Sequence, residues 1–183
     1  MFVLNDKTVL QSGKSWTDDN GLTHPSNWAS AWSVDDKAAY GIKEVSIQTK
    51  PDEKFYWVTG PALDGSWTST EKNLNDVTQT VLGEDVTTKG LKSEWINRTK
   101  KTANSLLAPT DWQVIAKADR DRAIDSNVAT YRAAVVTKCA AIETSITNAA
   151  NLNAFKALFD VPVDSDGNPT GNAPMYDWPV MGE

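Results

Sequence analysis

The sequence predicts an α+β protein, with a small β-rich N-terminal domain followed by a C-terminal helical hairpin or bundle and an extended tail. Three observations support this prediction. Short β-prone runs alternate with turn residues near the N-terminus, helical spacing of apolar residues begins after Lys89, and the last residues are rich in Asp, Gly, Asn and Pro. At 183 residues the chain can form one medium domain or two small ones.

Residues 1–65 are expected to form the β-rich domain, with one short helix. Apolar runs such as residues 2–4 are separated by turns such as Asn20-Gly21, since Asn and Gly accept a positive φ. The helix should begin at Ser33, whose hydroxyl can cap free backbone amides, and end at Tyr40-Gly41. The run Phe55-Tyr56-Trp57-Val58 has the best strand composition of the chain.

Residues 66–88 are polar, rich in Thr and without clear periodicity. We interpret this segment as a polar linker, or as a weak connection of strand and loop.

Residues 89–160 are predicted to form the helical hairpin or bundle. Pro109 should end the first helix, because the residue before a proline avoids the helical conformation. Along that helix, apolar side chains recur at steps of four and three and form one stripe. The stripe consists of Leu91, Trp95, Thr99, Ala103 and Leu106.

A longer helix is expected over about 126–149, capped by Ser126 or Asp125. Its spacing is that of a coiled-coil seam, which could close against helix 89–107 or between subunits. Arg132 lies within this seam and should have a carboxylate partner or an edge position. The seam residues are Val128, Arg132, Val135, Cys139, Ile142, Ile146 and Ala149.

Residues 161–183 should form an extended tail. Its apolar side chains could dock in a groove; they are Met175, Tyr176, Trp178 and Val180.

Composition and charge argue against several classes of protein. The formal net charge is −6 and Lys and Arg are scattered, which disfavours binding to nucleic acid or to an anionic membrane surface. The longest apolar runs are too short to cross a membrane. The first ten residues lack the basic and apolar regions of a secretory signal, so we expect the chain to be made in a cytoplasm.

Two residue types common in active sites, Cys and His, are scarce. Cys139 and His24 are the only cysteine and histidine, which excludes an internal disulfide and argues against a His-based triad or multi-His metal site. The Asp-rich runs at 18–21 and 164–168 lack the further acids of a calcium loop and are read as turns. We therefore predict no catalytic residue, cofactor or metal site, and expect His24 to be a hydrogen-bonded structural residue.

Two patterns in the chain resemble those of known proteins. Leu106-Leu107, Thr110-Asp111-Trp112 and Tyr131-Arg132 match an LL-x-x-TDW…YR-x-x-(V/L) signature. This signature resembles that of tailed-bacteriophage tail proteins, including tail-fibre assembly proteins. Turn and aromatic residues nearer the N-terminus resemble a second pattern of such tail proteins; they are Gly13, Trp16-Thr17, Gly21, His24-Pro25, Asn27-Trp28 and Lys37 to Ile42.

The resemblance implies a non-enzymatic structural protein of the phage tail, at or near a fibre or baseplate. Such a protein would be found in the virion, and in the host cytoplasm during assembly. It would act through contacts with other tail proteins and, as a homo-oligomer, with its own copies. One alternative is a transient tail-fibre assembly chaperone that is absent from the mature virion. Another is a glycan-binding receptor module that uses exposed Trp and Tyr side chains.

On this interpretation three groups of residues carry the structure and its contacts. Trp112, Tyr131 and Arg132 would hold the helical corner together. The 128–149 stripe would drive self-association, so that Val135→Asp or Ile142→Asp would produce a monomer, with Ile146 in the same seam. The expected anchors of the N-terminal domain are Trp16, Trp28 and Trp57.

Overall fold

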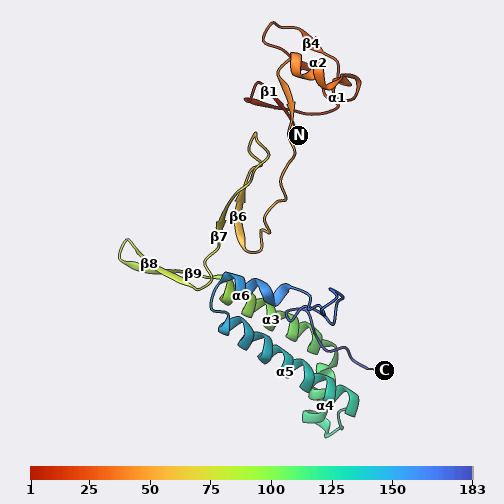
Figure 1. Ribbon diagram of the computed structural model, residues 1–183. Helices are drawn as coiled ribbons and strands as arrows, with labels where there is room; N and C mark the ends of the chain where they lie inside the picture. The colour runs from red at the N-terminus through yellow and green to blue at the C-terminus, as the bar shows by residue number, and fades with distance from the viewer. Residues whose placement is uncertain (183) are drawn as a thin grey trace. The chain divides into compact units, whose positions relative to one another are not determined.

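The computed structural model describes residues 1–182 and has the predicted α+β composition, with antiparallel strands and long C-terminal helices (Figure 1). The chain forms two compact units, residues 1–71 and residue 72 onward. The expected boundaries are therefore corrected. The first unit extends past residue 65, and the second begins before the predicted helices.

The first unit is built from three small antiparallel sheets and two short helices. In the largest sheet the strand order is β2-β1-β5. The strands are β1 (Phe2–Leu4), β2 (Thr8–Leu10), β3 (Trp16–Thr17), β4 (Thr23–His24), β5 (Ile42–Glu44), β6 (Tyr56–Thr59) and β7 (Thr68–Glu71). β3 pairs with β4, and β6 pairs with β7.

The predicted N-cap at Ser33 is confirmed at the start of α2 (Val34–Ala39). Ser33 Oγ accepts from the Asp36 amide, and the Asp36 carboxylate accepts from the Ser33 amide, so each satisfies a free donor of the other. The helix ends before Gly41, which has a φ of +71°. A second helix, α1 (Trp28–Ala31), also forms, so the expectation of one short helix in this unit is corrected.

Trp28 is at the centre of the first unit and is fully buried. Its indole nitrogen donates to the Lys14 carbonyl over 2.9 Å, so burying this aromatic ring leaves its polar atom satisfied. The buried residues packed in this core are Leu10, Trp16, Trp28 and Ile42.

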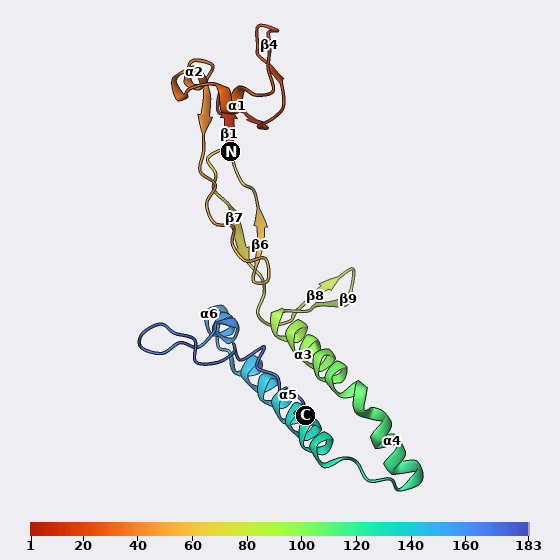
Figure 2. The same cartoon turned by 90° about the vertical axis from the view of Figure 1, so that its right-hand side faces the viewer.

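The second unit consists of a β-hairpin followed by helices, and α3 and α5 lie side by side in both views (Figures 1 and 2). Its elements are β8 (Val77–Val81), β9 (Glu84–Thr88), α3 (Leu91–Leu107), η1 (Ala108–Thr110), α4 (Asp111–Arg120), α5 (Ser126–Asn148), α6 (Leu152–Lys156) and η2 (Ala157–Phe159).

The predicted seam of α5 closes within the chain, against α3. Val135 and Ile146 are completely buried and Ile142 is 3% exposed. On α3 the predicted stripe is buried from Leu91 to Ala103. Because the seam side chains are occupied inside one molecule, the expectation that they drive self-association is wrong.

The polar segment 66–88 is not a linker, and the alternative expectation, a connection of strand and loop, is confirmed. Its first part contributes β7, and its second part forms the β8–β9 hairpin. The hairpin turns through Leu82 and Gly83, which have φ values of +53° and +88°, as a tight two-residue hairpin turn requires. The Val and Thr side chains of this segment favour extended backbone, which explains the strands.

Two hydrogen bonds join the start of α3 to the residues just before the hairpin. The Leu91 amide donates to the Asn73 carbonyl over 2.9 Å. The Gly90 amide donates to the Asp76 carboxylate over 2.8 Å. This bond is the main cause that lowers the pKa of Asp76. A Cβ at Gly90 would collide with the Asn75 carbonyl, so the close approach requires glycine.

The tail docks on the helices only in part. Met175 is 4% exposed, and its amide donates to the Leu158 carbonyl. Trp178 packs against the core of the α3–α5 pair. Tyr176 is half exposed and Val180 is 90% exposed, so the expected docking of Val180 is wrong.

Candidate interaction site

The corner between α3 and α4 is held by Arg132, which reaches it from α5. Its Nη1 donates to the Leu107 carbonyl over 2.9 Å and to Thr110 Oγ1 over 2.7 Å. The same nitrogen lies 2.9 Å from the Asp111 carboxylate, which is the partner expected for a charge within the seam. One guanidinium thus connects the last turn of α3, the η1 turn and the start of α4.

Tyr131 adds a second connection to the same corner. This residue is 9% exposed, and its hydroxyl donates to the Leu106 carbonyl over 3.4 Å. Thr110 is buried, and its hydroxyl donates to the Leu107 carbonyl over 2.8 Å. These bonds occupy carbonyls that the helix end would otherwise leave without a partner.

Trp112 does not hold this corner, which corrects the sequence prediction. Its side chain is 51% exposed and that of Ile115 is 65% exposed. The buried positions of α4 are instead Gln113 and Ala116, one residue further along.

The buried Gln113 explains why α4 turns its apolar side chains outward. Its amide donates to the Asp125 carboxylate over 2.8 Å and accepts from the Asp125 backbone amide over 2.9 Å. This pair connects α4 to the start of α5. Sequence reasoning missed it, because Gln is usually exposed and the partner lies beyond a loop.

Trp112 and Ile115 therefore form part of an exposed apolar surface on α4, which we call the α4 surface. The two residues are three positions apart and lie on the same side of the helix. The Arg122 guanidinium lies 5.3 Å from the Trp112 ring centre, within the range of a cation–π contact. Exposed Trp flanked by Arg is the composition typical of protein-contact sites.

The β8–β9 hairpin carries a second exposed surface with apolar side chains. The pairing register places Val77, Val81 and Val86 on one face, interspersed with Gln79, Glu84 and Thr88. The opposite face is polar, with a Thr78–Thr87 hydroxyl contact of 2.8 Å. Val81 and Val86 are each about half exposed, and Leu82 at the tip is fully exposed. Because a two-stranded hairpin is only marginally stable alone, a covering surface would stabilise it.

The structure places the expected anchors of the first unit in different environments. Trp16 and Trp28 lie in its core. Trp57 is 68% exposed on β6, so its assignment as an anchor is wrong. Strand alternation turns it away from the more buried Tyr56 and Val58.

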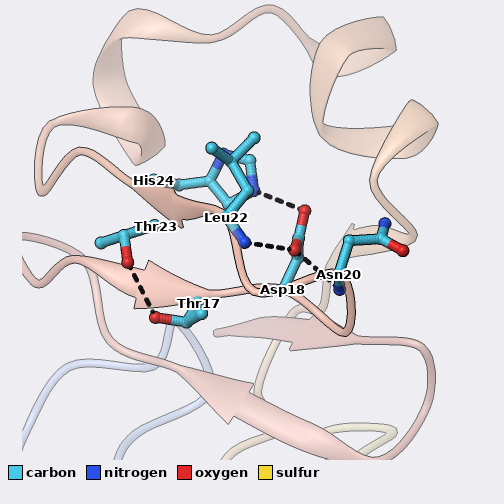
Figure 3. A network of polar contacts seen from close by, with 6 residues as sticks. All are labelled: Thr17, Asp18, Asn20, Leu22, Thr23 and His24. Carbon is cyan, nitrogen blue, oxygen red and sulfur yellow. Dashed lines mark hydrogen bonds and ion pairs between the residues drawn. The ribbon is translucent and has the colours of Figure 1, made fainter.

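His24 has the structural role that was predicted, on β4 beside the turn that joins β3 to β4 (Figure 3). It is 4% exposed, and its Nε2 lies 3.1 Å from an Asp18 carboxylate oxygen. The other Asp18 oxygen accepts from the Leu22 and Asn20 amides. These hydrogen bonds lower the pKa of Asp18, and the bond from the Leu22 amide contributes most. The carboxylate therefore stabilises the turn until the pH falls through this lowered pKa.

Cys139 lies in the α5 seam, and burial together with a hydrogen bond to Glu143 raises the pKa of its thiol to about 11. We expect iodoacetamide to modify the native chain about 100-fold more slowly at pH 8 than the urea-unfolded chain, because only the thiolate reacts. Mass spectrometry over time measures both rates, and equal rates would contradict the prediction. The contribution of this thiol to stability should be complete below pH 9.0 and lost as the pH rises through about 11.

Several other features of the described chain bear on function. Within residues 1–182, no three His, Cys, Asp or Glu side chains gather closely enough to hold a metal ion. Asp164 accepts from the Asp166 and Asn168 amides, which makes that segment the turn expected. No helix in the same range has both the length and the apolar character needed to cross a bilayer.

Comparison with models of protein families, with curated proteins and with solved structures finds no match to this chain. The contacts of the α3–α4 corner and the two exposed apolar surfaces are therefore the basis for a functional interpretation.

Proposed function

We propose that this protein is a non-enzymatic component of a bacteriophage tail, attached to a fibre or baseplate through protein–protein contacts. The resemblance of the TDW…YR signature to tail proteins motivates the proposal. The observation that supports it is that some residues of this signature bond within the fold while Trp112 is exposed. Thr110 and Asp111 each bond to Arg132 in the corner, while Trp112 is left 51% exposed.

An exposed Trp leaves a large apolar side chain in water, which is unfavourable unless a partner covers it. The folded chain does not require Trp112 for its core, since Gln113 and Ala116 fill the buried side of α4. The α4 surface and the apolar face of the hairpin both belong to the second unit. We take these two surfaces as the contacts with another tail protein.

Quantitative mass spectrometry of purified particles tests the proposal, using particles produced from the genome that encodes this chain. A fixed ratio of this chain to the major tail proteins is the expected result. Finding it only in the infected-cell lysate, bound to fibre protein, would identify a transient assembly chaperone instead. Absence both from the particles and from the fibre protein in the lysate would contradict both roles.

Trp112→Ala is expected to reduce incorporation into particles, or binding to the tail partner, by about 30-fold, the loss typical of a central interface Trp. The copy number per particle is measured by mass spectrometry after complementation with the variant. Because the side chain is half exposed, the thermal unfolding midpoint should change little.

Trp57→Ala is the matched control, since Trp57 is an exposed Trp of the other unit. Normal incorporation is expected for this control. Normal incorporation of Trp112→Ala as well would exclude the α4 surface as the contact.

A further inference from the structure

We propose that two copies of this chain associate through the open edge of β8, so that their hairpins form one antiparallel sheet of four strands. Within residues 1–182, β9 is the strand that pairs with β8, and the sheet has no third strand. In the dimer the β8 strands of the two copies lie side by side at the centre, with a β9 strand on each outer side. This pairing uses the edge of the hairpin and leaves both of its faces open.

The sequence of β8 is a palindrome, Val-Thr-Gln-Thr-Val over residues 77–81. When two such strands pair antiparallel about Gln79, each Val lies opposite a Val, each Thr opposite a Thr, and the two Gln side chains meet at the two-fold axis. A two-fold dimer requires a self-complementary surface, because the same residues contribute from both sides. Pairs of Thr and of other β-branched residues directly opposite each other also stabilise a sheet.

The backbone of β8 presents hydrogen-bonding groups at the positions that this pairing uses. Val81 and Glu84 close the two-residue turn, where the paired residues bond across the hairpin. Bonded and non-bonded pairs alternate along an antiparallel ladder, so Thr78 and Thr80 turn their N–H and C=O groups to the open edge. The 2.8 Å contact between the Thr78 and Thr87 hydroxyls fits a non-bonded pair, whose side chains lie closer. In the dimer, Thr78 of each copy exchanges backbone bonds with Thr80 of the other.

The hairpin is accessible to a second copy. In both views it extends away from the helices of its own unit (Figures 1 and 2). Residues 78–81 and the whole of β9 are exposed. A hairpin of two strands is only marginally stable in water, whereas three or more strands can form a stable sheet. Pairing of two hairpins supplies the missing strands.

Charge selects the β8 edge for this contact. Each chain has a net charge of −6, so two copies repel each other unless the surfaces that meet are neutral. β8 contains neither a charged residue nor a proline, the residues with which proteins protect an open strand edge. β9 begins with Glu84-Asp85, and this acidic edge disfavours the addition of further strands. The association therefore stops at a closed dimer.

Sedimentation velocity of the intact chain tests the proposal at concentrations from about 5 to 500 µM. So small an interface should give a reversible dimer with a Kd on the order of 100 µM. Gln79→Lys and Gln79→Glu each place like charges opposite each other at the two-fold axis. Either variant alone should dimerise at least about 10-fold more weakly than the wild type. An equimolar mixture of the two should restore the dimer, because unlike charges then meet.

Thr78→Pro and Thr87→Pro form a matched pair, since the two residues lie opposite each other in the hairpin. The Thr78 amide faces the open edge of β8 and the Thr87 amide that of β9, so neither proline removes a bond between the strands. Thr78→Pro should weaken dimerisation at least about 10-fold, whereas Thr87→Pro should leave it unchanged. Circular dichroism checks that both variants remain folded.

A wild-type chain that stays monomeric at about 500 µM overturns the proposal. It is also overturned if the mixture of Gln79→Lys and Gln79→Glu associates no better than either variant alone. Equal losses for Thr78→Pro and Thr87→Pro would exclude the β8 edge as the contact. These measurements use the purified chain alone, so none of them depends on whether it is part of a phage tail.

Discussion

Val135→Asp is expected to destabilise the second unit by at least about 3–5 kcal/mol, enough to unfold it at room temperature. Val135 is completely buried where α5 packs against α3. An aspartate there would place an unpaired carboxylate in an apolar seam, and protonating it instead would still leave a buried polar group without a partner. Urea unfolding followed by circular dichroism at the helical band measures the loss.

The neighbouring residue provides the control. Val136 is 57% exposed, so Val136→Asp should change the free energy of unfolding by no more than about 0.5 kcal/mol. Light scattering on both variants separates folding from self-association. A Val135→Asp protein that is folded and monomeric, while the Val136→Asp protein is an oligomer, would show that the seam joins subunits and would contradict its closure within one chain.

Arg132→Met should lower the free energy of unfolding of the second unit by about 1.5–3 kcal/mol, the range for hydrogen bonds to a charged group. The side chain of Arg132 is 21% exposed, whereas that of Asp111 is 54% exposed. We therefore assign most of the effect to the Leu107 carbonyl and Thr110 hydroxyl, and little to the solvent-screened ion pair. Urea unfolding again measures the difference.

Two further substitutions bracket this result. Arg132→Lys keeps the charge but loses the planar set of donors, and should fall between the wild type and Arg132→Met. Arg120→Met is the control, since Arg120 is 77% exposed and lies 3.8 Å from its partner Asp119. Equal losses for Arg132→Met and Arg120→Met would show that the corner does not depend on Arg132.

The long helices could be predicted because the sequence signals that indicate them lie within a few neighbouring residues. Apolar steps of four and three marked α3 and α5, and most of the resulting stripe residues are buried, with Leu106, Arg132 and Cys139 partly exposed. Likewise, Ser33 marked the start of α2 through a capping bond that spans only three residues.

The sequence left open a connection of strand and loop over 66–88 but did not identify the β8–β9 hairpin, because its turn has an unusual composition. Two-residue turns with positive φ at both positions favour Asn-Gly, but this turn uses Leu82 before Gly83. Thr side chains at 78, 80 and 87 made the segment read as polar, although β-branched residues also favour strands. The glycine after Leu82, between two runs of Val and Thr, was the signal that could have revealed it.

The α4 surface was missed for a different reason. Sequence reasoning assigned Trp112 and Ile115 to the interior because they are apolar. The side of α4 that faces inward is set by Gln113, which pairs with Asp125 across a loop. No local rule predicts that a glutamine will be buried in preference to a tryptophan.

By itself, the sequence determined the α+β class, the positions of α2, α3 and α5, and the scarcity of residues for His- or Cys-based chemistry. These follow from composition, periodicity and capping, which act over a few neighbouring residues. The tertiary structure alone decided that the α5 seam closes inside the chain, that Trp112 faces solvent, and that the Trp16 indole is buried without an acceptor. Each of those outcomes depends on which distant groups fill the space around a side chain, and that is settled only when the elements pack.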